Sequence, residues 1–153
     1  MIARRNLLVH GSTLGAATVL LIPASALAGV VQPDTLGAVT RAYAGTSQIR
    51  EGRVAIEIAS LVDNGNSVPI TVTVQSPMTT DERVVGIAIF NEKNPQPEVA
   101  EFTLGPRAGR AKISTRIRLA TTQKIVAMAK MADGSCWTHT VEVVVTLAAC
   151  LED

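Results

Sequence analysis

Aromatic residues are scarce in this sequence, and their scarcity excludes several kinds of binding site. Phe, Trp and Tyr together make up 3% of the chain, with one Trp, one Tyr and two Phe among 153 residues. Proteins that hold single-stranded nucleic acid stack its bases on aromatic side chains, and a haem pocket would draw on the same residue types. The chain has too few of them for either role, so its core must be built from Val, Ile, Leu and Ala.

A strong charge of either sign is also missing. The formal net charge is +1, and Arg4 and Arg5 contribute to it, so the rest of the chain is near neutral or slightly acidic. Nucleic-acid binding depends on a basic surface that neutralises phosphate groups. We therefore expect no nucleic-acid partner.

The familiar catalytic fingerprints are absent as well. The sequence contains no phosphate-binding loop, no dinucleotide-binding fingerprint and no carboxylate dyad. Cys150 and His139 would make a Cys-His pair, but on one extended segment they are separated by roughly 36 Å. The residues therefore give an enzyme only weak support, and we expect neither a cofactor nor a metal.

The N-terminal apolar stretch is too short to cross a membrane. Residues 11–22 fall below the roughly 20 residues that a transmembrane helix needs. Arg4 and Arg5 precede the stretch, and Ala26-Leu27-Ala28 follows it, as in a secretory signal that ends at a signal-peptidase site. Paired arginines before two leucines resemble the twin-arginine export signal. We expect residues 1–28 to be this signal, which predicts a periplasmic protein without a membrane anchor.

Two cysteines in an exported protein suggest a disulfide, but their positions argue against one. Cys136 and Cys150 are predicted to lie on the same extended segment, roughly 45 Å apart. A disulfide needs Cα atoms within about 7 Å. We expect Cys150 to be a free thiol or to form a link between molecules.

Residue periodicity predicts one short helix followed by strands. The helix is capped by Asp34 or Thr35 and ended by Gly45. From residue 54 onward apolar residues alternate with polar ones, as in strands with one buried face. The predicted strands cover residues 54–58, 68–74, 85–90, 99–104, 111–119, 124–131 and 137–147.

Seven short strands on a chain of single-domain size predict an all-β fold, an immunoglobulin-like antiparallel β-sandwich. The first two strands are expected to form a hairpin through a turn at residues 63–67. The domain covers residues 29–147. An arm at residues 148–153 follows it and carries Cys150; being tethered at one end only, the arm is expected to be mobile.

Four separate blocks of residues resemble one family. They are Asp63-Asn64-Gly65-Asn66-Ser67-Val68-Pro69, Ser76-Pro77-Met78, Ile89-Phe90-Asn91-Glu92-Lys93-Asn94-Pro95-Gln96-Pro97, and Asp133-Gly134-Ser135 before Trp137. Together they resemble SoxY, the sulfur-carrier subunit of the bacterial thiosulfate-oxidising Sox system. Several blocks in the right order are far more specific than one short motif.

The resemblance implies a periplasmic carrier protein that is not itself a catalyst, together with a set of partners. SoxY pairs with SoxZ, a second small β-sandwich, and carries sulfur intermediates covalently on a cysteine near its C-terminus. Sox cytochromes attach thiosulfate oxidatively, a hydrolase releases the sulfone group as sulfate, and a sulfane dehydrogenase oxidises the sulfur that remains. By this resemblance Cys150 is the attachment site, and a heterodimer with a SoxZ-like subunit is expected.

The residues around Cys150 depart from the family pattern. The family's arm is Gly-Gly-Cys-Gly-Gly, whereas the flanking residues here are Ala148, Ala149, Leu151 and Glu152. Leu151 is bulky, and the carboxylate of Glu152 would repel anionic thiosulfate. Two other interpretations therefore stay open: a noncovalent binding sandwich, and a thiol-redox or metal-handling protein that also uses Cys136.

Other candidate ligands have a simpler structural interpretation. His139 shares a strand face with Val141 and Val143, so we expect it to pack or to bond to backbone, and one Cys and one His do not make a zinc site. A soft copper site would need methionines on one face. We expect core packing instead for Met78, Met128 and Met131.

Charged and polar segments are also interpreted as structural first. A basic row is expected to be a solvated strand face, with anion steering or contact with an acidic partner as the alternative; it comprises Lys112, Arg116 and Arg118, with Arg107 and Arg110 in the preceding turn. Asn91-Glu92-Lys93 contains no combination of a nucleophile, a base and a residue to orient them, so we expect an interface or structural loop.

Overall fold

The computed structural model of this chain describes residues 34–148. The predicted export signal and Cys150 therefore lie outside the described residues. The elements are α1 (Thr35–Ala44), β1 (Ile49–Glu51), β2 (Val54–Glu57), β3 (Leu61–Asn64), β4 (Val68–Val74), β5 (Val84–Asn91), β6 (Glu98–Thr103), β7 (Lys112–Ile117), β8 (Gln123–Met131) and β9 (Cys136–Leu147). Within these residues no helix is long and apolar enough to span a membrane.

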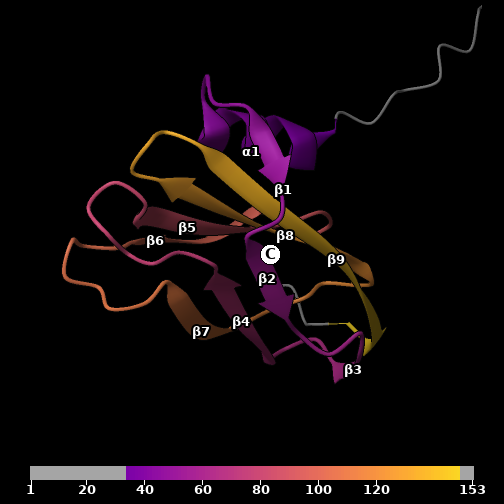
Figure 1. Cartoon of the computed structure of the whole chain (residues 1–153). Helices are drawn as coiled ribbons and strands as arrows, with labels where there is room; N and C mark the ends of the chain where they lie inside the picture. The colour runs from indigo at the N-terminus through magenta and orange to yellow at the C-terminus, as the bar shows by residue number, and fades with distance from the viewer. Residues whose placement is uncertain (1–33, 149–153) are drawn as a thin grey trace, which may run out of the picture. The chain divides into compact units, whose positions relative to one another are not determined.

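Two sheets pack face to face, which confirms the predicted sandwich (Figure 1). The larger sheet has the order β1-β9-β8-β5-β6, with β3 also paired to β9, and the smaller has the order β2-β4-β7. The period-two pattern explains the packing: in β4, Val68, Ile70, Val72 and Val74 are buried, and the residues between them are not. They meet apolar side chains of the larger sheet, including Ile87 on β5, in an inter-sheet core.

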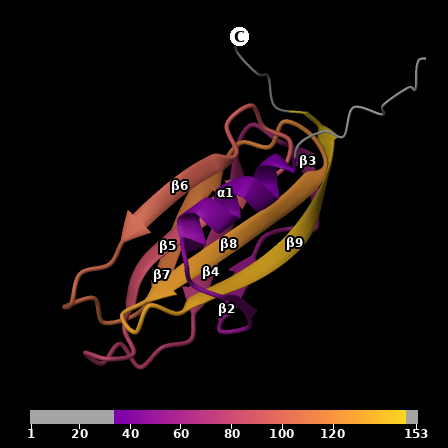
Figure 2. The same cartoon turned by 90° about the horizontal axis from the view of Figure 1, so that it is seen from above.

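A second apolar cluster, the helix core, lies between α1 and the outer face of the larger sheet (Figure 2). The helix begins where the Asp34 carboxylate accepts a hydrogen bond from the Gly37 N–H at 2.9 Å. It ends at Gly45, whose φ of 63° suits a residue without a Cβ. Tyr43 meets Phe90 of β5 edge to face at 5.6 Å between ring centroids. Because α1 covers this face, β5 is buried on both sides.

The strand count was underestimated, because residues 34–148 contain nine strands and not seven. The seven predicted strands pair antiparallel with one another, as expected. The two additional strands, β1 and β3, are short, and both run parallel to β9. They lack a clear apolar alternation, so the period-two pattern could not reveal them.

The predicted hairpin between the first two strands is only partly correct. β2 and β4 do pair antiparallel, with Val54 opposite Val74. The chain between them does not turn back directly, because residues 61–64 cross to the larger sheet and form β3. The turn itself is shorter than predicted and centres on Gly65 and Asn66.

β9 is the strand around which the other elements are arranged. One of its edges pairs with β8 along most of its length. The other edge pairs with β1 at Cys136 to Thr138 and with β3 from Val144 to Leu147. Between these two pairings, the Ile56 N–H of the smaller sheet donates a hydrogen bond to Nδ1 of His139 at 3.2 Å. His139 is thus bonded to backbone, as predicted.

Candidate functional site

The end of β9 is held firmly up to Leu147, three positions before Cys150. The Leu147 carbonyl accepts a hydrogen bond from the Gly65 N–H at 2.9 Å, and the Val144 N–H donates to the Ser60 carbonyl at 2.9 Å. The Thr146 hydroxyl donates to the Asp63 carbonyl at 3.1 Å. β3 and the turn after it therefore fix the point from which the predicted arm departs.

Three large apolar side chains are exposed beside this point. Within residues 34–148, the exposed large apolar residues are Leu61 at 59%, Val144 at 46% and Leu147 at 66%. Leu61 of β3 lies directly opposite Val144 of β9 in the parallel pairing. We call these three residues the collar. Leu61 and Val144 share one face, whereas Leu147 shares the strand face of Val145, which packs against the inter-sheet core. The collar therefore surrounds the end of β9 and is not one continuous apolar patch.

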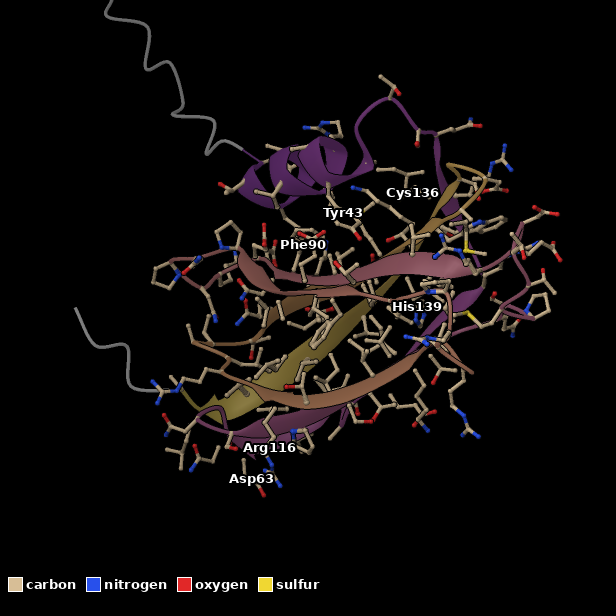
Figure 3. The ribbon with its side chains drawn as sticks, turned by 90° about the vertical axis from the view of Figure 1, so that its left-hand side faces the viewer. Tyr43, Asp63, Phe90, Arg116, Cys136 and His139 are labelled. Atoms are coloured by element: carbon tan, nitrogen blue, oxygen red, sulfur yellow. The ribbon has the colours of Figure 1, made fainter. Side chains whose placement is uncertain are left out.

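Basic side chains of β7 lie near the same end of the sandwich. Gly65, which binds Leu147, also accepts a hydrogen bond from the Leu119 N–H at 2.9 Å. Arg116 is exposed and donates from its guanidinium to the Ser67 hydroxyl at 3.2 Å (Figure 3). Arg118, two residues further on, is also exposed. The predicted basic row is thus a solvated face, but part of it borders the end of β9.

The polar loop that follows β5 is structural. The Asn94 side-chain oxygen accepts hydrogen bonds from the Ala120 N–H at 2.9 Å and from the Gln123 amide at 2.8 Å. The Gln123 oxygen accepts from the Lys93 N–H at 2.8 Å. This network joins the loop to the start of β8, next to the end of β7. Sequence reasoning identified the loop but missed Gln123, which looks like an ordinary polar residue and is buried.

Cys136 lies at the opposite end of β9 from the collar and is sealed in the helix core. Its exposed fraction is 0%, and it is a free thiol. Burial raises the pKa of this thiol, and the nearby ammonium of Lys130 lowers it by a smaller amount. A buried neutral thiol is inert. Cys136 is therefore poorly placed for the redox role that one interpretation gave it.

The other predicted ligands do not assemble into a metal site. Residues 34–148 contain no group of three or more His, Cys, Asp or Glu side chains that could hold a metal ion. Met128 belongs to the helix core, whereas Met131 belongs to the inter-sheet core. The two methionines lie on opposite faces of the sheet, which confirms that they pack in cores and do not converge.

A small groove lies beside α1. Its volume is about 280 Å³, and Leu36, Ile49 and Met128 contribute to its mostly apolar lining. Its acidic residue, Asp34, is engaged in capping the helix. Ligand pockets usually begin near 300 Å³ and contain a few convergent polar groups. The groove lies at the lower limit of this range, and the hydroxyls of Thr40 and Thr138 in its lining are already bonded to backbone carbonyls.

Comparison with known proteins identified one family. The model of the family described as "Sulfur oxidation protein SoxY" matches residues 40–150. The structure of the sulfur carrier protein SoxY from Chlorobium limicola f thiosulfatophilum is similar, with 30% sequence identity and a TM-score of 0.62 over 73% of this chain and 96% of that chain. No curated protein matched the sequence.

More distant structures share the fold alone. A superoxide reductase (neelaredoxin) from Ignicoccus hospitalis has 15% identity and a TM-score of 0.55, over 61% of this chain and 80% of that one. A putative superoxide reductase from Thermotoga maritima has 18% identity and a TM-score of 0.53, over 67% of this chain and 89% of that one. At these identities the likeness indicates a common sandwich architecture and carries no functional information.

Proposed function

This chain belongs to the SoxY family, and from that premise we propose that it is a periplasmic sulfur carrier that holds thiosulfate-derived intermediates covalently on Cys150. The observation that carries the proposal is the extent of the family match, which runs from residue 40 to residue 150 and so includes the cysteine. The 30% identity with a protein described as a sulfur carrier supports it. Export through the twin-arginine signal at residues 1–28 is part of the proposal.

The proposed cycle begins with oxidative loading. The Cys150 thiol and thiosulfate join through a new S–S bond to give a cysteine S-thiosulfonate, Cys–S–S–SO₃⁻. The thiol proton is released, and an electron pair passes to a cytochrome partner. The carrier contributes a presented thiol, and the partner contributes the oxidant.

Hydrolysis and further oxidation follow on other partners. Water attacks the sulfone sulfur of the adduct, the bond between the two outer sulfurs breaks, and sulfate and a proton leave. Cys150 is left as a persulfide, Cys–S–SH. A sulfane dehydrogenase then oxidises the outer sulfur. Each enzyme supplies its own catalytic groups, so the carrier needs no general base. His139 does not serve as one, since its Nδ1 accepts the Ile56 N–H.

A SoxZ-like β-sandwich subunit is the proposed stable partner. The family match supports this expectation. Purification of the chain from its native periplasm tests the point: a SoxZ-like subunit should copurify in equal amount. A stable monomer that is fully active in thiosulfate oxidation would contradict it.

Mass spectrometry of Cys150 tests the carrier role directly. Protein purified without reductant from cells grown on thiosulfate should yield a Cys150 peptide with an S-thiosulfonate or persulfide mass. Cys150→Ser should abolish this adduct, while Cys136→Ala, which removes the buried thiol, should keep it. A bare Cys150 thiol in the wild type would favour a noncovalent binding role, and a Cys136–Cys150 crosslink would favour a redox role.

A further inference from the structure

The loop between β4 and β5, residues 75–83, contains a methionine in an unusual backbone conformation. Met78 has a φ of 54°, in the left-handed region that residues with a side chain rarely adopt. Within residues 34–148, Arg53 is the one other non-glycine residue with a positive φ. A strained conformation of this kind persists only where the surrounding contacts hold it. The contacts of Met78 therefore show what its side chain does.

These contacts join the loop to itself, to β5 and to the inter-sheet core. The Met78 N–H donates to the Ser76 hydroxyl at 3.0 Å, and that hydroxyl donates to the Glu82 carbonyl near the other end of the loop. The thioether sulfur of Met78 accepts a hydrogen bond from the Val84 N–H at 3.5 Å. Val84 is the first residue of β5 and is fully buried. The Met78 side chain also packs against the inter-sheet core.

Met78 differs from the other methionines of the described chain in its exposure. Met128 is 0% exposed and Met131 is 3% exposed, and each is packed in one of the two cores. Met78 is half-buried. A core shields a thioether from an oxidant dissolved in the solvent, whereas a thioether at the surface can be converted to the sulfoxide. Met78 is therefore the methionine of residues 34–148 that a small oxidant can reach.

We propose that Met78 is a site of reversible oxidation by hydrogen peroxide, and that its sulfoxide releases the 75–83 loop from β5. The sulfur gives an electron pair to one peroxide oxygen, the O–O bond breaks, and an S=O bond forms while water leaves. The methionine is oxidised by two electrons and the peroxide is reduced. This modification site is independent of the proposed carrier role of Cys150.

The added oxygen does not fit the contacts that Met78 makes. The sulfur lies 3.5 Å from the Val84 nitrogen, and an N–H···O bond alone takes up about 2.9 Å. An oxygen on the sulfur that pointed at Val84 would crowd this nitrogen unless the loop moved away. An oxygen turned the other way would place a polar group against the apolar inter-sheet core, which is unfavourable. Either arrangement disturbs the contacts that hold the strained loop.

Peroxide treatment followed by mass spectrometry tests the site. The protein is purified from its native periplasm as Cys150→Ser, with any subunit that accompanies it, so that this thiol consumes no peroxide. The Met78 peptide should gain the mass of one oxygen atom about tenfold faster than the Met128 and Met131 peptides, because the cores shield those two.

Amide hydrogen exchange tests the release of the loop. Exchange over residues 76–84 should accelerate after oxidation of Met78, while exchange over β8 should not change. Methionine sulfoxide reductases restore the thioether, so treatment with them should restore slow exchange at Val84.

Two further variants in the same background separate the sulfur of Met78 from general damage. Met78→Leu keeps an apolar side chain of similar size but removes the acceptor of the Val84 N–H. We expect fast exchange at Val84 in this variant before peroxide is added, and no further change afterwards. The matched control, Met131→Leu, removes a buried methionine and should respond to peroxide as its parent does.

Three outcomes would overturn the proposal. Oxidation of Met78 no faster than that of Met128 and Met131 would exclude it as the site. Met78 sulfoxide with unchanged exchange at Val84 would show that oxidation does not release the loop. A peroxide-dependent rise in exchange that persists in Met78→Leu would assign the effect to another residue.

Discussion

The two ends of β9 differ sharply: Cys136 begins the strand, and Leu147 ends it three positions before Cys150. At the first end, Cys136 is covered by α1, and Trp137 stacks against the guanidinium of Arg53 at 5.0 Å. The Trp137 indole N–H donates to the Ser135 hydroxyl at 3.1 Å. At the other end, Val145 packs against the inter-sheet core and the Thr146 hydroxyl donates to the Asp63 carbonyl, but the collar stays exposed.

The difference teaches that a cysteine in this chain need not be a reactive one, because cover by the helix core makes Cys136 inert. Both thiols belong to one chain in one compartment, but Cys136 serves as a small apolar residue in a core. Cys150 follows the point at which packing of the described chain ends. The same strand therefore anchors the domain at one end and presents the proposed carrier thiol at the other.

The largest expected effect is on thiosulfate loading, which should depend on Cys150 and not on Cys136. Cys150→Ser should abolish loading by thiosulfate and the oxidising partner, because a serine hydroxyl cannot form the S–S bond. Cys136→Ala should load at the wild-type rate and lose only stability, since it leaves a small cavity in the helix core. Intact mass after incubation with the partner measures both. Loss of loading in a folded Cys136→Ala protein would break the comparison.

Weakening the helix core that covers Cys136 should make this thiol accessible to solvent. Phe90→Ala deletes a fully buried ring of the helix core, which should lower the free energy of unfolding by about 3–5 kcal/mol. Urea unfolding measures that loss. In a Cys150→Ser background, labelling of Cys136 by a thiol reagent under native conditions should accelerate strongly. Equal labelling rates with and without Phe90 would show that something other than the helix core protects the thiol.

The middle of β9 should be sensitive to loss of a single hydrogen bond. His139→Phe keeps a ring at this position but leaves the Ile56 N–H without its acceptor. An unsatisfied, partly buried donor costs about 1–3 kcal/mol, to be measured by urea unfolding. Thiosulfate loading should not change, because His139 has no proposed role in it. Slower loading by a variant that remains folded would instead favour a catalytic role for the histidine.

Charge near the collar should have a smaller effect, on rate alone. Arg116 and Arg118 are exposed near the end of β9, and basic groups there attract anions such as thiosulfate or an acidic partner. Arg116→Glu/Arg118→Glu should slow loading several-fold at low ionic strength and much less at high salt, because salt screens exposed charges. A slowing that does not depend on salt would point to a direct contact instead.

Much of the fold was predictable because apolar and polar residues alternate along its long strands. Residues such as Val68, Ile70 and Val72 alternate strictly, and each alternation appeared as a strand. β1 and β3 were missed because their pairing with β9, and not a pattern in their own residues, makes them strands. Ile49-Arg50-Glu51 has no apolar alternation, and Asp63-Asn64 resembles a turn until β9 lies beside it. Parallel pairing between distant segments leaves no period in the sequence.

Of the proposed site, the sequence pointed to Cys150, which stays a prediction, and did not reveal the surface at the end of β9. Cys150 stood out because of its position and the family resemblance. The collar could not be read from Leu61 and Val144, since isolated apolar residues in strands usually point inward. Only their pairing on the outer face at the end of β9 makes them a surface. Gln123 was hidden for the same reason, because its burial depends on a loop thirty residues away.

The smallest expected effect concerns alkaline stability at the covered end of β9. Burial raises the pKa of Cys136 in the folded protein, so above about pH 8.5, the ordinary pKa of cysteine, the unfolded chain loses its thiol proton before the folded one does. The folded state then binds more protons than the unfolded state, and stability falls as pH rises. In a Cys150→Ser background, urea unfolding between neutral and alkaline pH should show this decline, and adding Cys136→Ala should remove part of it. Identical pH dependence with and without Cys136 would mean that the thiol titrates freely in the folded protein, and the contrast between the two ends of β9 would then lie in exposure alone.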